Sequence, residues 1–178
     1  MSNQLIQWFL LIAPWLTLVF MKGSEVKRYI ASGLLSIVLT TIVHDVGTTF
    51  GFWVVRETTY PFYEMMPYFY GTMPVITLWV LKFTFGRFWQ YMALNTISDL
   101  GFAFIILDYF YPITGVYGLV NITPLPTAGI ALLLAVIIYP FQMWQDDIFV
   151  LTERAQIYST SLQQPALKPL DKDEDNKK

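Results

Sequence analysis

Five long runs of apolar residues, separated by short polar connections, dominate the pattern of this sequence. The runs lie at about residues 5–21, 29–55, 67–83, 88–110 and 124–144. A helix needs about 20 apolar residues to cross a bilayer, and these runs lack the alternation of β-barrel strands. The pattern therefore predicts an all-α, polytopic membrane protein whose five transmembrane helices form a bundle over residues 1–152.

The character of the chain changes after about residue 152. Residues 153–178 become increasingly polar and end in the charged run 171–178. A segment of this kind has too little apolar surface to order itself, so we predict a disordered cytoplasmic tail. The alternative is a tail that docks onto a partner protein.

The composition supports a membrane protein. Charged residues make up 13% of the chain, against about 25% in an average soluble domain. Cysteine is absent, which excludes disulfide frameworks, thiolate metal sites and cysteine nucleophiles. The net charge of -2 gives no electrostatic basis for binding nucleic acid.

The basic residues predict the orientation. If the N-terminus lies outside, the outer segments contain only Arg56. The inner segments then contain Lys22, Lys27, Arg28, Lys82, Arg87, Arg154, Lys168, Lys172, Lys177 and Lys178. Loops on the cytoplasmic side carry an excess of lysine and arginine, so the N-terminus is predicted outside and the C-terminus inside.

Two of the predicted spans carry ionisable residues at similar depths. His44 and Asp45 lie in the second span, and Asn95 and Asp99 share one face of the fourth. An ionisable side chain in a membrane helix costs about 2.5–3.5 kcal/mol on insertion scales and therefore indicates function. We predict a buried polar site of these four residues between the two helices, and the alternative is that they form hydrogen bonds that hold the bundle together.

A secondary polar face is predicted nearer the inner side. Tyr139, Gln142 and Asp146 share one face of the fifth span, and Tyr91 lies near the inner start of the fourth. The single histidine and the absence of cysteine leave only carboxylates to complete a metal site. We therefore predict no metal, no cofactor and no catalytic residues.

Gly47 and Gly51 form a small-xxx-small pattern in the second span. Small residues at this spacing let another helix approach closely. The partner is either a helix of the same chain, another membrane protein or a second copy of the chain.

The outer side is rich in aromatic residues. They are Phe50, Phe52, Trp53, Tyr60, Phe62, Tyr63, Tyr68, Phe69, Tyr70, Tyr109, Phe110, Tyr111 and Tyr117. One interpretation is an enlarged aromatic belt at the membrane interface. The other is an outward mouth for an amphipathic or cationic ligand.

Three stretches together carry a family resemblance: residues 25–29, the run 77–88 that leads into Tyr91, Asn95 and Asp99, and residues 139–146. With them the chain resembles a family of small, uncharacterised multi-pass membrane proteins of spore-forming Gram-positive bacteria. The resemblance implies a location in the bacterial cytoplasmic membrane and implies no activity.

Three functions remain open at this stage. The first is a membrane protein that handles or senses a small molecule or a proton at His44, Asp45, Asn95 and Asp99. The second is a non-catalytic membrane subunit that acts through helix packing and its charged tail. The third is an intramembrane enzyme with a carboxylate pair, although the chain has none of the common hydrolase or phosphate-binding motifs.

Overall fold

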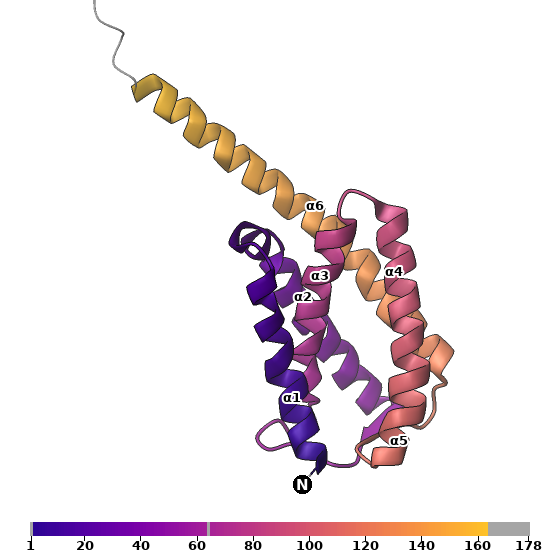
Figure 1. Cartoon of the computed structure of the whole chain (residues 1–178). Helices are drawn as coiled ribbons and strands as arrows, with labels where there is room; N and C mark the ends of the chain where they lie inside the picture. The colour runs from indigo at the N-terminus through magenta and orange to yellow at the C-terminus, as the bar shows by residue number, and fades with distance from the viewer. Residues whose placement is uncertain (1, 64, 164–178) are drawn as a thin grey trace, which may run out of the picture.

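The computed structural model describes residues 2–63 and 65–163, and these residues are mostly helical (Figure 1). In chain order the elements are α1 (Ser2–Leu16), η1 (Thr17–Phe20), α2 (Gly23–Thr49), β1 (Trp53–Val55), η2 (Pro67–Phe69), α3 (Thr72–Thr84), α4 (Phe88–Gly101), η3 (Phe102–Phe110), α5 (Tyr111–Thr114), β2 (Tyr117–Leu119) and α6 (Pro124–Gln163). η1 and η2 are 3₁₀ helices, and η3 is a π-helix.

The long helices run alternately up and down as a bundle (Figure 1). The α3–α4 loop lies at one end, which we call the hairpin end, and the β1–β2 pair lies at the other, which we call the sheet end. At the hairpin end, an ion pair of 3.0 Å between Lys82 Nζ and Glu25 Oε2 joins α3 to α2.

Four segments of the described residues are long and apolar enough to cross a membrane. They are Asn3–Phe20, Gly23–Thr49, Phe88–Thr114 and Pro124–Ile148. α3 has only 13 residues, which corresponds to about 20 Å of helix. The chain is therefore a mainly helical protein with the character of a membrane protein.

The second helix is shorter than the predicted span 29–55. α2 ends at Thr49, and Gly51 takes a left-handed conformation with φ of 69°, which glycine adopts without steric cost. The chain then reverses, and β1 pairs antiparallel with β2 through Trp53 and Leu119. The all-α prediction thus holds for the bundle, and a two-stranded sheet covers one end.

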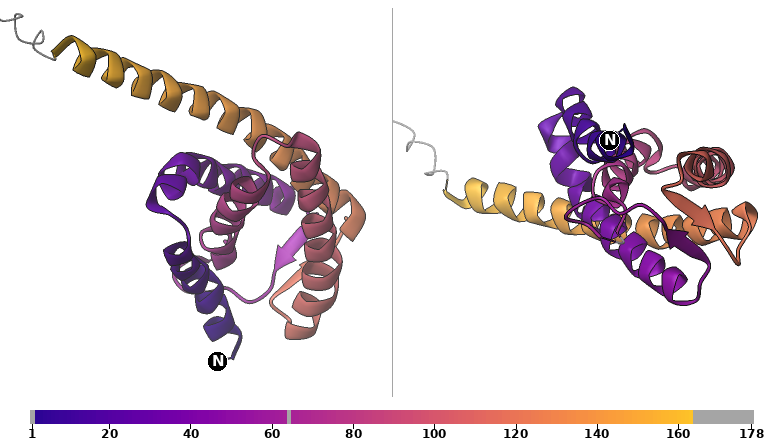
Figure 2. Two further views of the ribbon diagram at one scale, coloured as in Figure 1. Left: turned by 45° about the horizontal axis from the view of Figure 1, so that its top comes forward. Right: turned by 90° about the horizontal axis from the view of Figure 1, so that it is seen from below.

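The last helix is longer than the predicted span 124–144. α6 has 40 residues, and beyond the bundle it continues as a projecting helix (Figures 1 and 2). The predicted boundary between bundle and tail, at residue 152, falls inside this helix. Residues 164–178, which include most of the predicted tail, lie outside the described residues.

The buried apolar residues form two clusters, one toward each end of the bundle. The cluster of the hairpin end is centred on Tyr29, Leu78, Leu81, Tyr91 and Tyr139. The cluster of the sheet end contains Trp53, Met66, Tyr68, Phe69, Leu107, Tyr111, Val116 and Tyr117. The space between the two clusters contains the candidate site.

Candidate ligand-binding cavity

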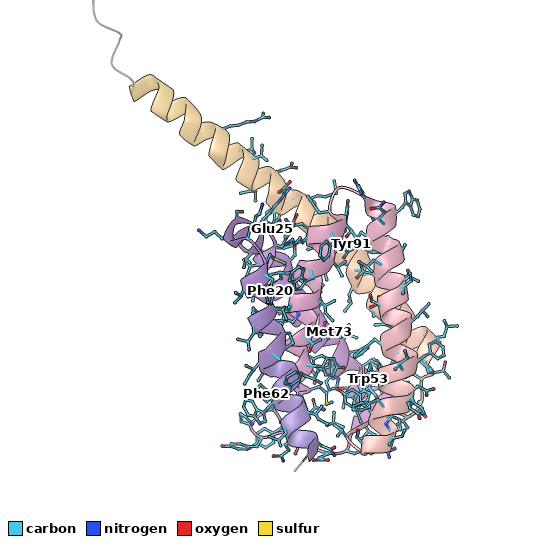
Figure 3. All side chains as sticks on the ribbon, in the orientation of Figure 1. Phe20, Glu25, Trp53, Phe62, Met73 and Tyr91 are labelled. Carbon is cyan, nitrogen blue, oxygen red and sulfur yellow. The ribbon has the colours of Figure 1, made fainter. Side chains whose placement is uncertain are left out.

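A cavity of about 150 Å³ lies inside the bundle. α2, α3, α4 and α6 form its walls, and β1, η2, η3 and β2 add residues at the sheet end. Figure 3 shows three of the lining residues in order, with Tyr91 toward the hairpin end, Trp53 toward the sheet end and Met73 between them. A dry cavity of about this size holds one benzene ring.

Aromatic rings surround His44 at the sheet end. His44 is 3% exposed, and its ring centroid lies 4.8 Å from that of Phe69, 6.1 Å from Trp53 and 6.4 Å from Tyr117. Trp53 Nε1 also donates a hydrogen bond of 3.2 Å to the carbonyl oxygen of His44. The reversal of the chain after α2 thus folds Trp53 back onto the last turns of this helix.

Tyr117 contributes a neutral hydroxyl to the same end. Burial raises the pKa of its phenol well above the ordinary value, and the neighbouring Tyr111 raises this pKa further. Both effects disfavour the charged form. Tyr117 therefore stays protonated in the physiological range.

The polar face of α4 points into the cavity. Tyr91, Asn95 and Asp99 all line it, as their spacing of four residues predicts. Tyr91 donates a hydrogen bond of 3.0 Å from its hydroxyl to the carbonyl oxygen of Ala135 on α6. Asn95 donates one of 2.8 Å from Nδ2 to the carbonyl oxygen of Tyr91, one turn back on the same helix.

One carboxylate oxygen of Asp99 accepts no hydrogen bond from the described residues. Its Oδ2 atom is buried and finds no hydrogen-bond partner among the described residues. Leaving a buried polar atom in this state costs about 1–3 kcal/mol, and more for a charged group. Asp99 is therefore the lining residue best placed to accept a hydrogen bond from a bound molecule.

The chain changes its winding directly after α4. η3 is a π-helix of nine residues, and three of its residues, Phe102, Ala103 and Leu107, line the cavity. π-helical turns are rare and are frequently found at functional sites. The wider winding shifts the helix face that follows Asp99 and extends the wall toward the sheet end.

Asp45 does not belong to the cavity. It is exposed and does not line the cavity, whereas His44, the preceding residue, does. Consecutive residues of an α-helix point about 100° apart, so the two side chains leave α2 on different faces. The structure thus brings together three of the four predicted residues: His44, Asn95 and Asp99.

The secondary polar face joins α6 to α2 at the hairpin end. Gln142 is fully buried, accepts a hydrogen bond of 2.7 Å from Ser32 Oγ and donates one of 3.1 Å to the carbonyl oxygen of Arg28. Asp146 accepts two hydrogen bonds from the Arg28 guanidinium, of 2.6 and 2.7 Å. These groups satisfy one another and lie outside the cavity.

Tyr139 and Tyr91 link the two sites. Their ring centroids lie 4.9 Å apart, and Phe88 packs edge-on against Tyr139 at 5.2 Å. These rings close the cavity at the hairpin end. Tyr91 thus belongs to the cavity, Tyr139 packs against α4, and Gln142 and Asp146 belong to the contact between α2 and α6.

The contributions of α3 and α6 to the cavity were not predicted from the sequence. Thr77 and Thr127 line it, but each hydroxyl bonds to the carbonyl oxygen four residues before it in the chain, 2.9 Å away. A lone threonine of this kind gives no sequence signal. The remaining α6 lining residues are alanine, isoleucine and leucine, which look like any other residues of a span.

A buried glutamine was also missed. Gln7 of α1 is 2% exposed, and its Oε1 finds no hydrogen-bond partner among the residues that the structure describes. It lies outside the lining of the cavity. The signal was present, because an amide in an otherwise apolar span is costly unless it faces protein.

Gly47 and Gly51 have different environments. A side chain at Gly47 would meet the ring of Trp53, so this glycine lets β1 pack closely against α2. Gly51 accepts a hydrogen bond of 2.9 Å at its carbonyl oxygen from Asn121 Nδ2. Gly47 thus supports packing within the chain.

Neither a metal-binding cluster of the described residues nor a known relative indicates the chemistry of the cavity. In the described ranges, 2–63 and 65–163, no group of three histidine or acidic side chains lies close enough to hold a metal ion. No protein-family model, curated protein or solved structure matches the chain. Function is therefore argued from the cavity itself.

Proposed function

We propose that this chain is an integral membrane protein that binds a small amphipathic molecule in the cavity between α2, α3, α4 and α6. The observation that carries the proposal is a largely apolar cavity whose lining includes His44, Asn95 and Asp99. Ligand pockets typically combine mostly apolar walls with a few convergent polar groups. Transport and sensing both begin with such binding.

The hydrogen bonding of Asp99 favours binding over packing. A polar group that only holds helices together is satisfied by its neighbours, as Gln142 is by Ser32 and Arg28. Asp99 Oδ2 instead lies buried without a partner in the described part of the chain, at the wall of a cavity. A ligand that donates a hydrogen bond would satisfy it.

We also propose five membrane crossings with the N-terminus outside. The support is that Lys22, Lys82 and Arg87 lie at or next to the hairpin end, in agreement with the positive-inside rule. α1 begins at the opposite end and α6 leaves past the hairpin end (Figure 1), as an odd number of crossings requires. α3, although short, runs between the same two ends.

The resemblance to small multi-pass proteins of spore-forming bacteria supplies a setting for this proposal. The resemblance implies a bacterial cytoplasmic membrane, and in the proposed orientation the hairpin end and the helical extension face the cytoplasm.

A second candidate function is a membrane subunit that binds a partner protein through α6. The observation that favours it is the projecting end of this helix (Figure 1), which carries exposed apolar side chains such as Val150 and Leu151. This candidate predicts a stable complex in native membranes. A chain that purifies from them alone and monomeric would exclude it.

The test of the first proposal is binding of 4-fluorobenzyl alcohol to the purified chain in lipid nanodiscs, followed by ¹⁹F NMR. This probe combines one ring with one hydroxyl and matches the cavity in size. We expect a saturable bound signal that disappears in Ala131→Phe, because the larger side chain fills the cavity from α6.

The matched control is Leu133→Phe, which places the same side chain on α6 at a position that is 64% exposed and outside the lining. It should bind the probe as the unchanged chain does. A bound signal of equal intensity in Ala131→Phe would show that the probe binds elsewhere and would refute the proposal.

A further inference from the structure

Both ends of the cavity are closed by buried side chains. At the sheet end, His44, Trp53, Tyr68, Phe69 and Tyr117 are each at most 5% exposed. At the hairpin end, Tyr91, Ala135 and Ile138 are similarly buried. The outward aromatic mouth that the sequence suggested is thus closed at the sheet end, and the cavity has no open path along the bundle axis.

Of the described lining residues only Ile76 is exposed, while partly exposed ones occur on all four walls. Ile76, in the middle of α3, lines the cavity and is 45% exposed, and on α4 Asn95 and Asp99 are partly exposed. α3 and α4 are joined at the hairpin end and separate below it (Figures 1 and 2). The lining is therefore most accessible from the side of the bundle, at Ile76 of α3.

The outer face of α4 and η3, at the same height, is apolar. Ile97 on α4 is 70% exposed, and Phe104 and Ile105 of η3 are 47% and 62% exposed. In a chain that crosses the bilayer, such a surface faces hydrocarbon. A sideways opening at this height leads to lipid, so a ligand that uses it must be soluble in the bilayer.

The charged groups of the lining favour a ligand of one sign of charge. Asp99 is the only acidic residue of the lining, and neither lysine nor arginine is found among the described residues that line it. The rings of Trp53, Tyr68, Phe69, Phe102 and Tyr117 also line it. Aromatic faces and a carboxylate attract cations, and a phosphate or carboxylate group would meet only His44 as a possible counter-ion.

From these observations, and resting on the proposed function, we infer that the ligand is a lipid-soluble amine that enters between α3 and α4. Its ammonium group lies at Asp99, where it donates a hydrogen bond to Oδ2. Because the cavity has room for about one ring-sized group, a longer apolar chain leaves past Ile76 into the bilayer.

The first test compares three probes of equal chain length in lipid nanodiscs: dodecylamine, dodecanol and dodecanoic acid. Native mass spectrometry counts the bound molecules. We expect dodecylamine to bind at least tenfold more tightly than dodecanol, and dodecanoic acid to show no saturable binding, because only the amine complements the carboxylate.

Two carboxylate variants locate the amine. Asp99→Asn should lower the affinity for dodecylamine at least tenfold and change that for dodecanol less than threefold, since only the charge is lost. Asp45→Asn is the matched control, because Asp45 is exposed and outside the lining. It should leave both affinities unchanged, and equal losses in the two variants would overturn the placement at Asp99.

Variants of Ile76 test whether the ligand's chain passes between α3 and α4. Ile76→Trp should lower the affinity for dodecylamine at least tenfold and that for benzylamine less than threefold, since benzylamine has no chain to pass the opening. Leu133→Trp, at another exposed apolar position, is the control and should change neither. Ile76→Phe, a smaller change at the same exposed position, should reproduce a weaker form of the effect.

The outcomes separate the two proposals. If 4-fluorobenzyl alcohol binds in the cavity but dodecylamine binds no better than dodecanol, the cavity stands and the amine is wrong. If Ile76→Trp and Ile76→Phe leave the affinity for dodecylamine unchanged, the bound chain does not pass Ile76 and the proposed opening between α3 and α4 is wrong. If neither 4-fluorobenzyl alcohol nor any amine binds, the proposed function itself fails.

Discussion

Glycines in this bundle differ in what surrounds them. A Cβ atom at Gly71, next to η2, would lie 2.3 Å from the carbonyl oxygens of Leu10 and Leu11 on α1. These are backbone atoms, so α1 itself must shift to admit a side chain. At Gly129 of α6, a Cβ atom would meet nothing within 4 Å.

The contrast yields a prediction at the scale of one residue. Gly71→Ala should lower the free energy of unfolding by about 1–3 kcal/mol, the usual cost of overpacking. Gly129→Ala should leave it unchanged or raise it by up to about 1 kcal/mol, because alanine favours helix. Thermal unfolding of the purified proteins in detergent measures both, and equal stabilities would show that α1 does not pack on Gly71.

Single positions also show how far the sequence could predict the site. Asn95 and Asp99 were predicted together because their spacing fixes a common helix face, and both line the cavity. His44 and Asp45 are adjacent, so they point about 100° apart. Spacing alone does not decide which of two neighbours faces the interior, because this depends on the helices that pack against α2.

At the scale of elements, α2 and α6 are joined by side chains that satisfy each other. Gln142 bonds to Ser32 Oγ and to the carbonyl oxygen of Arg28, and Asp146 bonds to the Arg28 guanidinium. The secondary polar face was thus predicted from its spacing, while its partners on α2 were not. Which side chains of α2 meet those of α6 depends on how the two helices cross, and the local sequence does not encode this crossing.

The contact between α2 and α6 gives a second prediction. Gln142→Leu should destabilise the protein by about 1–3 kcal/mol, because it removes two hydrogen bonds and leaves Ser32 Oγ buried. Gln145→Leu, the same change at a partly exposed position of α6, should cost less than about 0.5 kcal/mol. Chemical unfolding in mixed micelles compares them, and a similar loss in both would contradict the role of Gln142.

The ends of elements were less predictable than their existence. Residues 53–55 looked like the end of a transmembrane helix because they continue an apolar run. They form β1 instead, since Gly51 reverses the chain and β2 supplies a strand partner from more than 60 residues later. A three-residue strand is too short to produce a recognisable alternation.

For the whole molecule, the proposed orientation predicts opposite accessibility of its two ends. The chain has no cysteine, so single cysteines can be placed without removing any. In intact cells, Asn121→Cys near the sheet end should react with a membrane-impermeant maleimide, and Arg87→Cys in the α3–α4 loop should react only after permeabilisation. Both positions are exposed.

Labelling of Arg87→Cys alone in intact cells would show that the orientation is the reverse of the one proposed. Labelling of both cysteines would mean that the two ends lie on the same side. The unchanged chain is the control for background, because it offers no thiol.

The ion pair between Arg28 and Asp146 is a mechanical link between α2 and α6. It lies on α6 between the residues that line the cavity, which end at Ile138, and the projecting part of the helix. Arg28 is fixed to α2, whose next turns carry Ser36, Thr40 and His44 along the cavity. A pull on the far end of α6 therefore reaches the cavity by two paths: along α6 itself, which lines the cavity up to Ile138, and through the ion pair to α2, the helix that carries His44.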